Sequence, residues 1–124
     1  MRLIDPQTQE VLLTDVEVAS NLWQRFFGLM FRRNFQHGFG LWLEPCRSIH
    51  TMWMRVPIDV YFINQDGMIV EHRAHVVPWS LVVPKQDCCR VLEIPCAGKN
   101  LAAKDLVVKN LAVGNKVCLQ GQRQ

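Results

Sequence analysis

Four ionisable side chains lie in segments that otherwise have the composition of a buried core: Arg25, His50, Asp59 and Glu93. In the segment PIDVYFI an alternation of period two places Asp59 on one face with Tyr61, and both faces are largely apolar. A carboxylate in such a setting needs hydrogen bonds or a nearby cation, because desolvation otherwise raises its pKa. The same reasoning applies to Glu93 in RVLEIP, and it suggests Arg25, which lies among aromatic residues, as the cation.

Two interpretations of these groups remain open from the residues alone. In the first, Arg25 forms a structural ion pair that fixes a helix to a sheet, and His50 is a hydrogen-bonded core histidine. In the second, the groups line a pocket in which Arg25 receives an anionic ligand, Asp59 or Glu93 accepts hydrogen bonds or protons, and Trp53 supplies apolar cover. The residues by themselves favour the structural interpretation.

Cysteine and histidine residues raise two further chemistries, and neither has strong spacing. Cys46 and His50 are four residues apart, so an extended strand would separate their side chains by about 13 Å, too far for a nucleophile and its base. A metal site is disfavoured because no group has the paired spacing of a structural zinc site; the groups considered are Cys46 and His50 with His72 and His75, or Cys88, Cys89 and Cys96. We therefore predict no metal and no cofactor.

Composition predicts a single domain over residues 1–124 that lies in the cytoplasm. With 49% apolar and 20% charged residues, the chain has the composition of a folded globular protein. Its five cysteines are odd in number and lack Cys-x-x-Cys spacing, which favours reduced thiols. No signal peptide and no run of eighteen apolar residues is seen, so we expect no membrane insertion.

The segment SNLWQRFFGLMFRR predicts a helix, because its apolar residues recur at three- and four-residue steps after a candidate N-cap, Ser20. Gly28 is expected to end this helix or to allow a close approach. Interleaved aromatic and basic residues also resemble a nucleic-acid or membrane surface, but helical spacing favours placing the aromatic residues in the core. Nucleic acid is accordingly a disfavoured partner.

Strands account for most of the remaining pattern. Valine-rich alternation in EVLLTDVEVAS predicts one strand or two short ones, and LWLEP predicts another. PIDVYFI and MIVEHRAHV flank a turn with Asp66 and Gly67, which is typical of a hairpin. RVLEIP and KVCL predict further strands, and AGKNLAAKDLVVKN predicts a second helix. The fold class expected is α+β and β-rich, a small mixed β-barrel with one or two short helices.

The C-terminal part of the chain carries a basic bias. After Cys96 the only acidic residue is Asp105, whereas the basic residues are Lys99, Lys104, Lys109, Lys116 and Arg123. We interpret most of these as the solvated face of a short helix and its flanks, with an interaction surface as the alternative.

Four motifs together resemble a known family, from about Thr14 to Leu119. These are RFFGLMFR, CRSIHTMWMRVPIDVYFINQDG, VVPW and RVLEIPCAG, and they place Arg25, His50, Asp59 and Glu93 at motif positions. The chain is similar to the bacterial and archaeal family called domain of unknown function 192 (DUF192), or uncharacterised protein family 0127 (UPF0127). The resemblance implies a compact mixed barrel of strands with a short helix, and it implies no activity. One departure is Gly114-Asn115, where the family usually has Gly-Asp.

Taken with the resemblance, the residues favour a binding module whose pocket holds a small anionic or polar ligand, or a peptide end. The pocket would be formed by Arg25, His50, Trp53, Asp59 and Glu93. One alternative is a hydrolase or transferase that uses His50 with Asp59 or Glu93. A second alternative is a structural or adaptor protein, and the oligomeric state is left open by the sequence.

Overall fold

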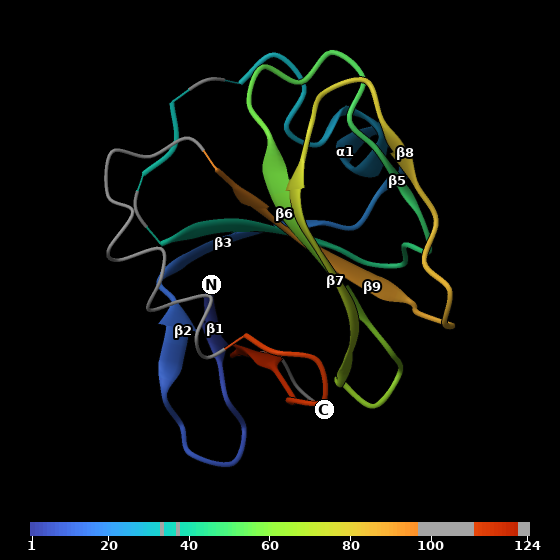
Figure 1. The fold of residues 1–124 in the computed structure, drawn as a ribbon. Helices are drawn as coiled ribbons and strands as arrows, with labels where there is room; N and C mark the ends of the chain where they lie inside the picture. The colour runs from blue at the N-terminus through green and yellow to red at the C-terminus, as the bar shows by residue number, and fades with distance from the viewer. Residues whose placement is uncertain (33, 37, 97–110, 122–124) are drawn as a thin grey trace.

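The computed structural model describes residues 1–32, 34–36, 38–96 and 111–121 (Figure 1). Within these residues there are one helix and ten strands. The helix is α1 (Leu22–Phe27), and the strands are β1 (Arg2–Ile4), β2 (Val11–Leu13), β3 (Asp15–Ala19), β4 (Phe39–Leu43), β5 (Ile49–His50), β6 (Ile58–Ile63), β7 (Ile69–Val76), β8 (Leu81–Val82), β9 (Arg90–Pro95) and β10 (Cys118–Gln120). The predicted α+β, β-rich class is confirmed.

The described strands form three sheets. A five-stranded sheet has the order β3-β4-β9-β6-β7, with β3 and β4 parallel and its other pairs antiparallel. A three-stranded sheet has the order β10-β1-β2, and β5 pairs with β8. Between the two larger sheets the contacts include the Val16 N–H bond to Met1 O at 2.8 Å and one isolated bridge between Met68 and Lys116. The ladders of the described residues stay open at β3 and β7, so the predicted barrel is not confirmed.

The predicted hairpin is confirmed as β6 and β7. Its turn is organised by the Asn64 side chain, whose Oδ1 accepts hydrogen bonds from the amides of Asp66 at 3.0 Å and Met68 at 2.9 Å. Gly67 has a φ of +83°, a conformation that a residue with a side chain rarely adopts. The predicted strands in EVLLTDVEVAS, LWLEP, RVLEIP and KVCL also correspond to observed strands, whereas the helix predicted over 97–110 lies outside the described residues.

Helix α1 departs from its prediction in two respects. Its N-cap is Asn21, not Ser20, because Asn21 and Gln24 form a capping box that begins the helix one residue later. The prediction that its aromatic residues belong to the core is wrong, since Trp23, Phe26 and Phe27 are exposed. At six residues the helix is too short to bury a full apolar stripe, and the buried anchor is Leu29, after the helix ends at Gly28.

Both faces of the five-stranded sheet are buried, which explains why β4 and β6 are buried at every position. One face packs against the three-stranded sheet through Tyr61, Ile63 and Leu92. The other packs under α1, β5 and β8 through Ile58 and Val60, with further residues such as Phe62 and Val91. Asp59 on β6 and Glu93 on β9 are therefore both buried, although they occupy opposite faces.

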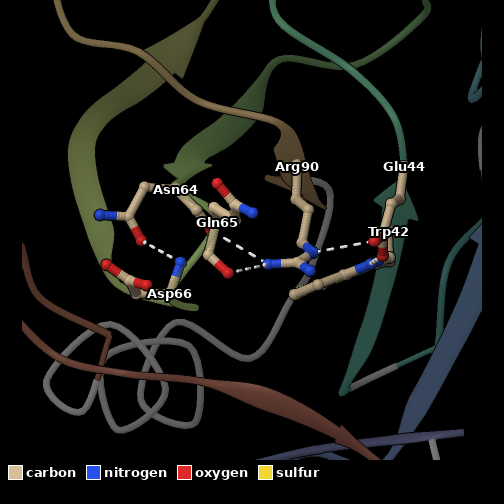
Figure 2. A network of polar contacts seen from close by, with 6 residues as sticks. All are labelled: Trp42, Glu44, Asn64, Gln65, Asp66 and Arg90. Atoms are coloured by element: carbon tan, nitrogen blue, oxygen red, sulfur yellow. Dashed lines mark hydrogen bonds and ion pairs between the residues drawn. The ribbon is translucent and has the colours of Figure 1, made fainter. Parts of the chain in front are cut away.

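A polar network ties the hairpin turn to the ends of β4 and β9 (Figure 2). Arg90 donates to Glu44 at 2.9 Å and to the carbonyl oxygens of Asn64 at 3.0 Å and Gln65 at 3.2 Å. Trp42 donates its indole N–H to the same Glu44 carboxylate at 2.9 Å. One arginine thus fixes the residue that immediately precedes the loop containing Pro45 and Cys46.

No helix among the described residues has both the length and the apolar character that spanning a bilayer requires.

Candidate functional site

A cavity of about 320 Å³ lies between α1, the connection from β4 to β5, and β9. Its walls are mainly apolar and include Phe26, Phe27, Leu43, Ile49 and Met54. Five residues with titratable or charged side chains belong to the same lining: Arg25, Cys46, Arg47, His50 and Glu93. Three of the predicted site residues therefore share one cavity although they are distant in sequence.

Arg25 comes from the last turn of α1 and lies half-buried. Its Nη1 donates to the carbonyl oxygen of Pro45 at 2.5 Å, which turns the guanidinium toward the β4–β5 connection. Its Nε is buried and has no hydrogen-bond partner. Among the described residues no carboxylate lies within ion-pair distance of Arg25, so the ion pair with an acid that the sequence favoured is not formed there.

His50 lies at the end of β5 and faces the helix. Its Nε2 is 3.1 Å from the carbonyl oxygen of Phe26, and the ring centroids of the two residues are 5.4 Å apart. A carbonyl oxygen accepts a hydrogen bond, so the proton belongs on Nε2 and the neutral ring keeps Nδ1 as an acceptor. Nδ1 is buried and has no partner, which leaves an unused acceptor on a residue of the cavity lining.

Glu93 is a buried carboxyl group on β9. The strand register places it opposite Leu41 and Val60, on the sheet face that packs under α1. Burial raises its pKa to about 8, so at neutral pH the group is mostly a neutral acid that can donate one hydrogen bond and accept others. None of the described residues makes a hydrogen bond to this carboxyl group, which lines the cavity.

Cys46 lines the same cavity as His50 because residues 46–48 precede the strand and do not extend it. Burial, and next the neighbouring Glu93, raise the pKa of the Cys46 thiol to about 11. The thiol donates a hydrogen bond to Ser48 O at 3.1 Å. Since the thiolate is the reactive form, this environment does not activate Cys46 as a nucleophile. None of the five cysteines, all of which belong to the described residues, forms a disulfide.

Asp59 and Trp53 lie away from the cavity, so the expected cluster of five residues is not formed. Asp59 is opposite Ile94 on the other sheet face, where it accepts hydrogen bonds from the His75 amide at 2.9 Å and the Cys96 thiol at 3.4 Å. Trp53 is 52% exposed and packs against Trp79, with ring centroids 4.7 Å apart. Period-two alternation identified both carboxylates as buried but does not say which face each occupies.

A second group of titratable residues surrounds Asp59. Tyr61 and His72 stack with their ring centroids 4.2 Å apart, and Tyr61 Oη and His72 Nε2 are buried without hydrogen-bond partners. Burial, and next the Asp59 charge, raise the pKa of Tyr61. Burial lowers the pKa of His72. From sequence, His72 is a candidate only as a metal ligand, and within the described residues no group of three or more potential metal ligands converges.

Sequence reasoning missed two features of this region. Cys46 was discounted as a neighbour of His50 because an extended strand was assumed, although Pro45 gave a signal against a strand at that point. The Glu44–Arg90 ion pair, at 2.9 Å, was also missed. It joins residues 46 positions apart, a pairing that local periodicity cannot indicate.

Sequence comparison assigns this β-rich chain to a family of uncharacterised proteins. The sequence profile of DUF192, described as "Uncharacterized ACR", matches residues 4–106, so the chain belongs to this family. The match begins earlier and ends earlier than the range inferred from the motifs.

Related sequences include UPF0127 proteins of two archaea. The protein of Pyrococcus furiosus is 37% identical over 65% of this chain and 72% of its own length. That of Pyrococcus abyssi is 31% identical over 82% of this chain and 83% of its own length.

Two solved structures from bacteria share the fold. A proposed transcription regulator of Sinorhizobium meliloti superposes with a TM-score of 0.72 and 28% identity, covering 94% of this chain and 89% of that one. A protein of unknown function from Novosphingobium aromaticivorans has a TM-score of 0.73 and 22% identity, covering 95% and 82%. The second likeness concerns the fold alone.

Proposed function

We propose that this protein binds a small molecule with an anionic or polar end and an apolar body in the cavity under α1. The observation that carries the proposal is the combination of unused hydrogen-bonding atoms in one lining. Arg25 Nε and His50 Nδ1 are both buried and unpartnered, and they belong to residues that line the same cavity as the neutral Glu93 carboxyl. Buried polar atoms are normally paired, so such a set favours a ligand that completes them.

The three groups differ in what they can offer a ligand. Arg25 already uses Nη1 on Pro45, and its Nε edge suits a carboxylate or another planar anion that accepts two parallel hydrogen bonds. His50 Nδ1 accepts a hydrogen bond from a ligand hydroxyl or amine, and the Glu93 acid group can donate one or accept one. The apolar walls suit a short hydrocarbon portion, and about 320 Å³ is at the small end of ligand pockets.

This proposal predicts binding of small carboxylates that bear a hydroxyl or amino group. We would screen them by saturation-transfer NMR against their primary-amide isosteres, with Arg25→Gln as the test variant. We expect carboxylates to bind preferentially and Arg25→Gln to weaken binding by about tenfold to a hundredfold, because a charge-assisted pair is lost. The matched control is Arg32→Gln, whose guanidinium pairs with Glu17 at 2.9 Å outside the cavity lining.

Melting temperatures of the same preparations distinguish a ligand-binding role of Arg25 from a purely structural one. Unchanged melting temperature with lost binding in Arg25→Gln supports the proposal. A melting temperature lowered by many degrees, with no carboxylate bound by either the original chain or Arg32→Gln, would instead favour the structural or adaptor alternative, in which Arg25 serves to hold α1 on the β4–β5 connection.

A second candidate is a hydrolase or transferase, and one observation favours it. Burial raises the pKa of Glu93 to about 8. A group whose pKa lies this close to neutral pH can both donate and accept a proton during catalysis. His50 shares its cavity, whereas Asp59 on the other sheet face does not. In this alternative Glu93 donates a proton while His50 Nδ1 accepts one. Hydrolysis of small esters that Glu93→Gln abolishes, with Asp59→Asn still active, would favour the enzyme.

A further inference from the structure

Six exposed aromatic side chains gather at the end of the molecule formed by α1, β5, β8 and their loops. Figure 1 shows these three elements together at the end away from the two termini. We call this set the aromatic end: Trp23, Phe26, Phe27, Phe31, Trp53 and Trp79. Trp23 packs on Phe27 at 5.9 Å and Phe27 on Phe26 at 5.4 Å, while Trp53 contacts both Phe31 at 5.9 Å and Trp79 at 4.7 Å, all between ring centroids.

The exposed apolar surface continues from the aromatic end onto β8. Leu81 is opposite His50 in the β5–β8 register, and the His50 ring contacts Phe26. Leu81, Val83 and Val77 are all exposed, as is Met52 beside Trp53. Monomeric proteins rarely expose so many large apolar side chains at one end unless this end contacts a partner or a membrane.

The backbone holds three of these aromatic side chains in an uncommon conformation. Phe31, Trp53 and Trp79 have positive φ values of 64°, 63° and 67°, a conformation that is rare for bulky residues and strains the backbone. Hydrogen bonds fix the arrangement, because the Phe31 amide donates to Trp53 O at 3.0 Å and the Trp79 amide to Thr51 O at 3.0 Å. Thr51 is buried, and its hydroxyl bridges Val77 O and the Ser80 amide at 2.7 Å each.

The three segments that form this end carry basic side chains but no acidic ones. Segments 20–32, 45–57 and 77–85 contain five basic residues and no acidic residue: Arg25, Arg32, Arg47, Arg55 and Lys85. Glu17, from β3, pairs with Arg32, and the amide of Lys85 binds Glu71. Arg47 and Arg55 are exposed, and no described residue forms an ion pair with either. The complementary partner is therefore anionic as well as apolar.

We propose that the aromatic end binds peripherally to the surface of an anionic phospholipid bilayer. Tryptophan and phenylalanine side chains favour the boundary between headgroups and acyl chains, and exposed arginines attract anionic headgroups. The exposed aliphatic side chains favour a bilayer over single-stranded nucleic acid as the partner. Bases stack on aromatic rings, but Leu81, Val83 and Val77 offer no ring for stacking and would be buried by acyl chains.

The experiment is co-sedimentation of the purified full chain with sucrose-loaded vesicles. One set is phosphatidylcholine alone, and the other contains phosphatidylglycerol at one part in three. We expect binding to the anionic vesicles, weakened by added salt, and a blue shift of the tryptophan fluorescence. Trp42 is buried and bonded to Glu44, so the shift should come from the exposed tryptophans and should be largely lost in the double variant Trp53→Ala/Trp79→Ala, whose partitioning should fall at least tenfold.

Matched variants test the location of the surface. Val83 and Val113 are 62% and 60% exposed. Val83 directly follows β8, whereas Val113 precedes Gly114, whose amide bonds to Ile69 O at the start of β7, so Val83→Ser should weaken vesicle binding and Val113→Ser should not. Arg55 and Arg2 are both exposed arginines, and Arg55→Gln should weaken binding about fivefold while Arg2→Gln leaves it unchanged. None of these residues lines the cavity under α1, so the result does not depend on the proposed ligand site.

Three outcomes would overturn the proposal. The first is no binding to anionic vesicles at physiological salt. The second is equal weakening by the members of each matched pair. The third is a labelled oligothymidine that binds the chain more tightly than the vesicles do and is displaced by the tryptophan substitutions, which would identify a single-stranded nucleic-acid surface. Circular dichroism of each variant confirms that lost binding is not lost fold.

Discussion

At the scale of single residues, two buried carboxyl groups have different surroundings on the two faces of one sheet. Glu93 faces the cavity under α1 with no hydrogen bond from the described residues, and burial raises its pKa to about 8. Asp59, opposite the neighbouring residue Ile94, accepts hydrogen bonds from an amide and a thiol on the other face. Hydrogen bonds to a carboxylate compensate its desolvation, and their absence leaves the neutral acid favoured.

Glu93 makes the stability of the protein depend on pH in a predictable direction. A carboxyl whose pKa is higher in the folded state stabilises the fold fully below its unfolded pKa of 4.5, and this contribution is lost as pH rises toward about 8. The loss is on the order of 3 kcal/mol by pH 7. We expect Glu93→Gln, which cannot ionise, to gain free energy of unfolding relative to the original chain between pH 5 and pH 8.

Urea unfolding of both proteins at several pH values between 4.5 and 8.5 measures this difference. The comparison isolates Glu93 because all other titrating groups are shared by the two chains. A difference in free energy of unfolding that stays constant across this range would show that Glu93 ionises at an ordinary pKa.

At the scale of elements, the sequence predicted the features that follow from local turn residues and short-period alternation. It did not predict the features that depend on which strands pair and in which register. The hairpin β6–β7 was predicted because its turn chemistry is local, and the burial of Asp59 was predicted because both faces of its strand are apolar. The separation of Asp59 from Glu93 follows from the β6–β9 register, which no local pattern contains. For α1, spacing identified a helix but also assigned Trp23 and Phe26 to a core that six residues are too few to reach.

The hydrogen bonds of Arg90 hold the end of β4 in position next to the cavity. We expect Arg90→Met to destabilise the protein by about 2–3 kcal/mol, because it removes charge-assisted hydrogen bonds to Glu44 and to two carbonyl oxygens of the turn. The control is Arg73→Met, which removes a short pair with Glu71 at 2.6 Å on the exposed edge strand and should cost at most about 1 kcal/mol.

Chemical denaturation of the two variants tests this order. An equal loss of unfolding free energy in the two variants would mean that the Arg90 network stabilises the protein no more than a surface ion pair does. The combined variant Glu44→Gln/Arg90→Met should be less destabilised than the sum of the single variants, because the two residues interact directly.

At the scale of the whole molecule, the three-stranded sheet meets the five-stranded sheet through the segment before β10. The Val117 amide donates to Gly67 O at 2.9 Å, the Ile69 amide to Asn115 O at 2.9 Å, and the Gly114 amide to Ile69 O at 2.8 Å. This contact joins the hairpin turn to a segment almost fifty residues later. The sequence predicted the turn at Gly67, but the proximity of this turn to Gly114 is a property of the complete fold.

The two glycines provide a matched test of that contact. Both have positive φ, +83° at Gly67 and +97° at Gly114, so alanine is strained at either position by about 1 kcal/mol. A Cβ at Gly67 would lie 2.9 Å from Val117 O, whereas a Cβ at Gly114 would meet no atom within 4 Å. We therefore expect Gly67→Ala to cost about 2–3 kcal/mol, because the backbone of the two segments must also separate.

Chemical denaturation measures the loss of unfolding free energy in each variant, and hydrogen exchange shows which amides lose protection. In Gly67→Ala the amides of Ile69 and Val117 should exchange faster than in Gly114→Ala, while amides of the β6–β9 ladder keep their relative protection. Equal costs and equal exchange in the two variants would mean that the approach of residue 117 to the turn contributes nothing to the fold, and that β10 and its sheet are held by their other contacts alone.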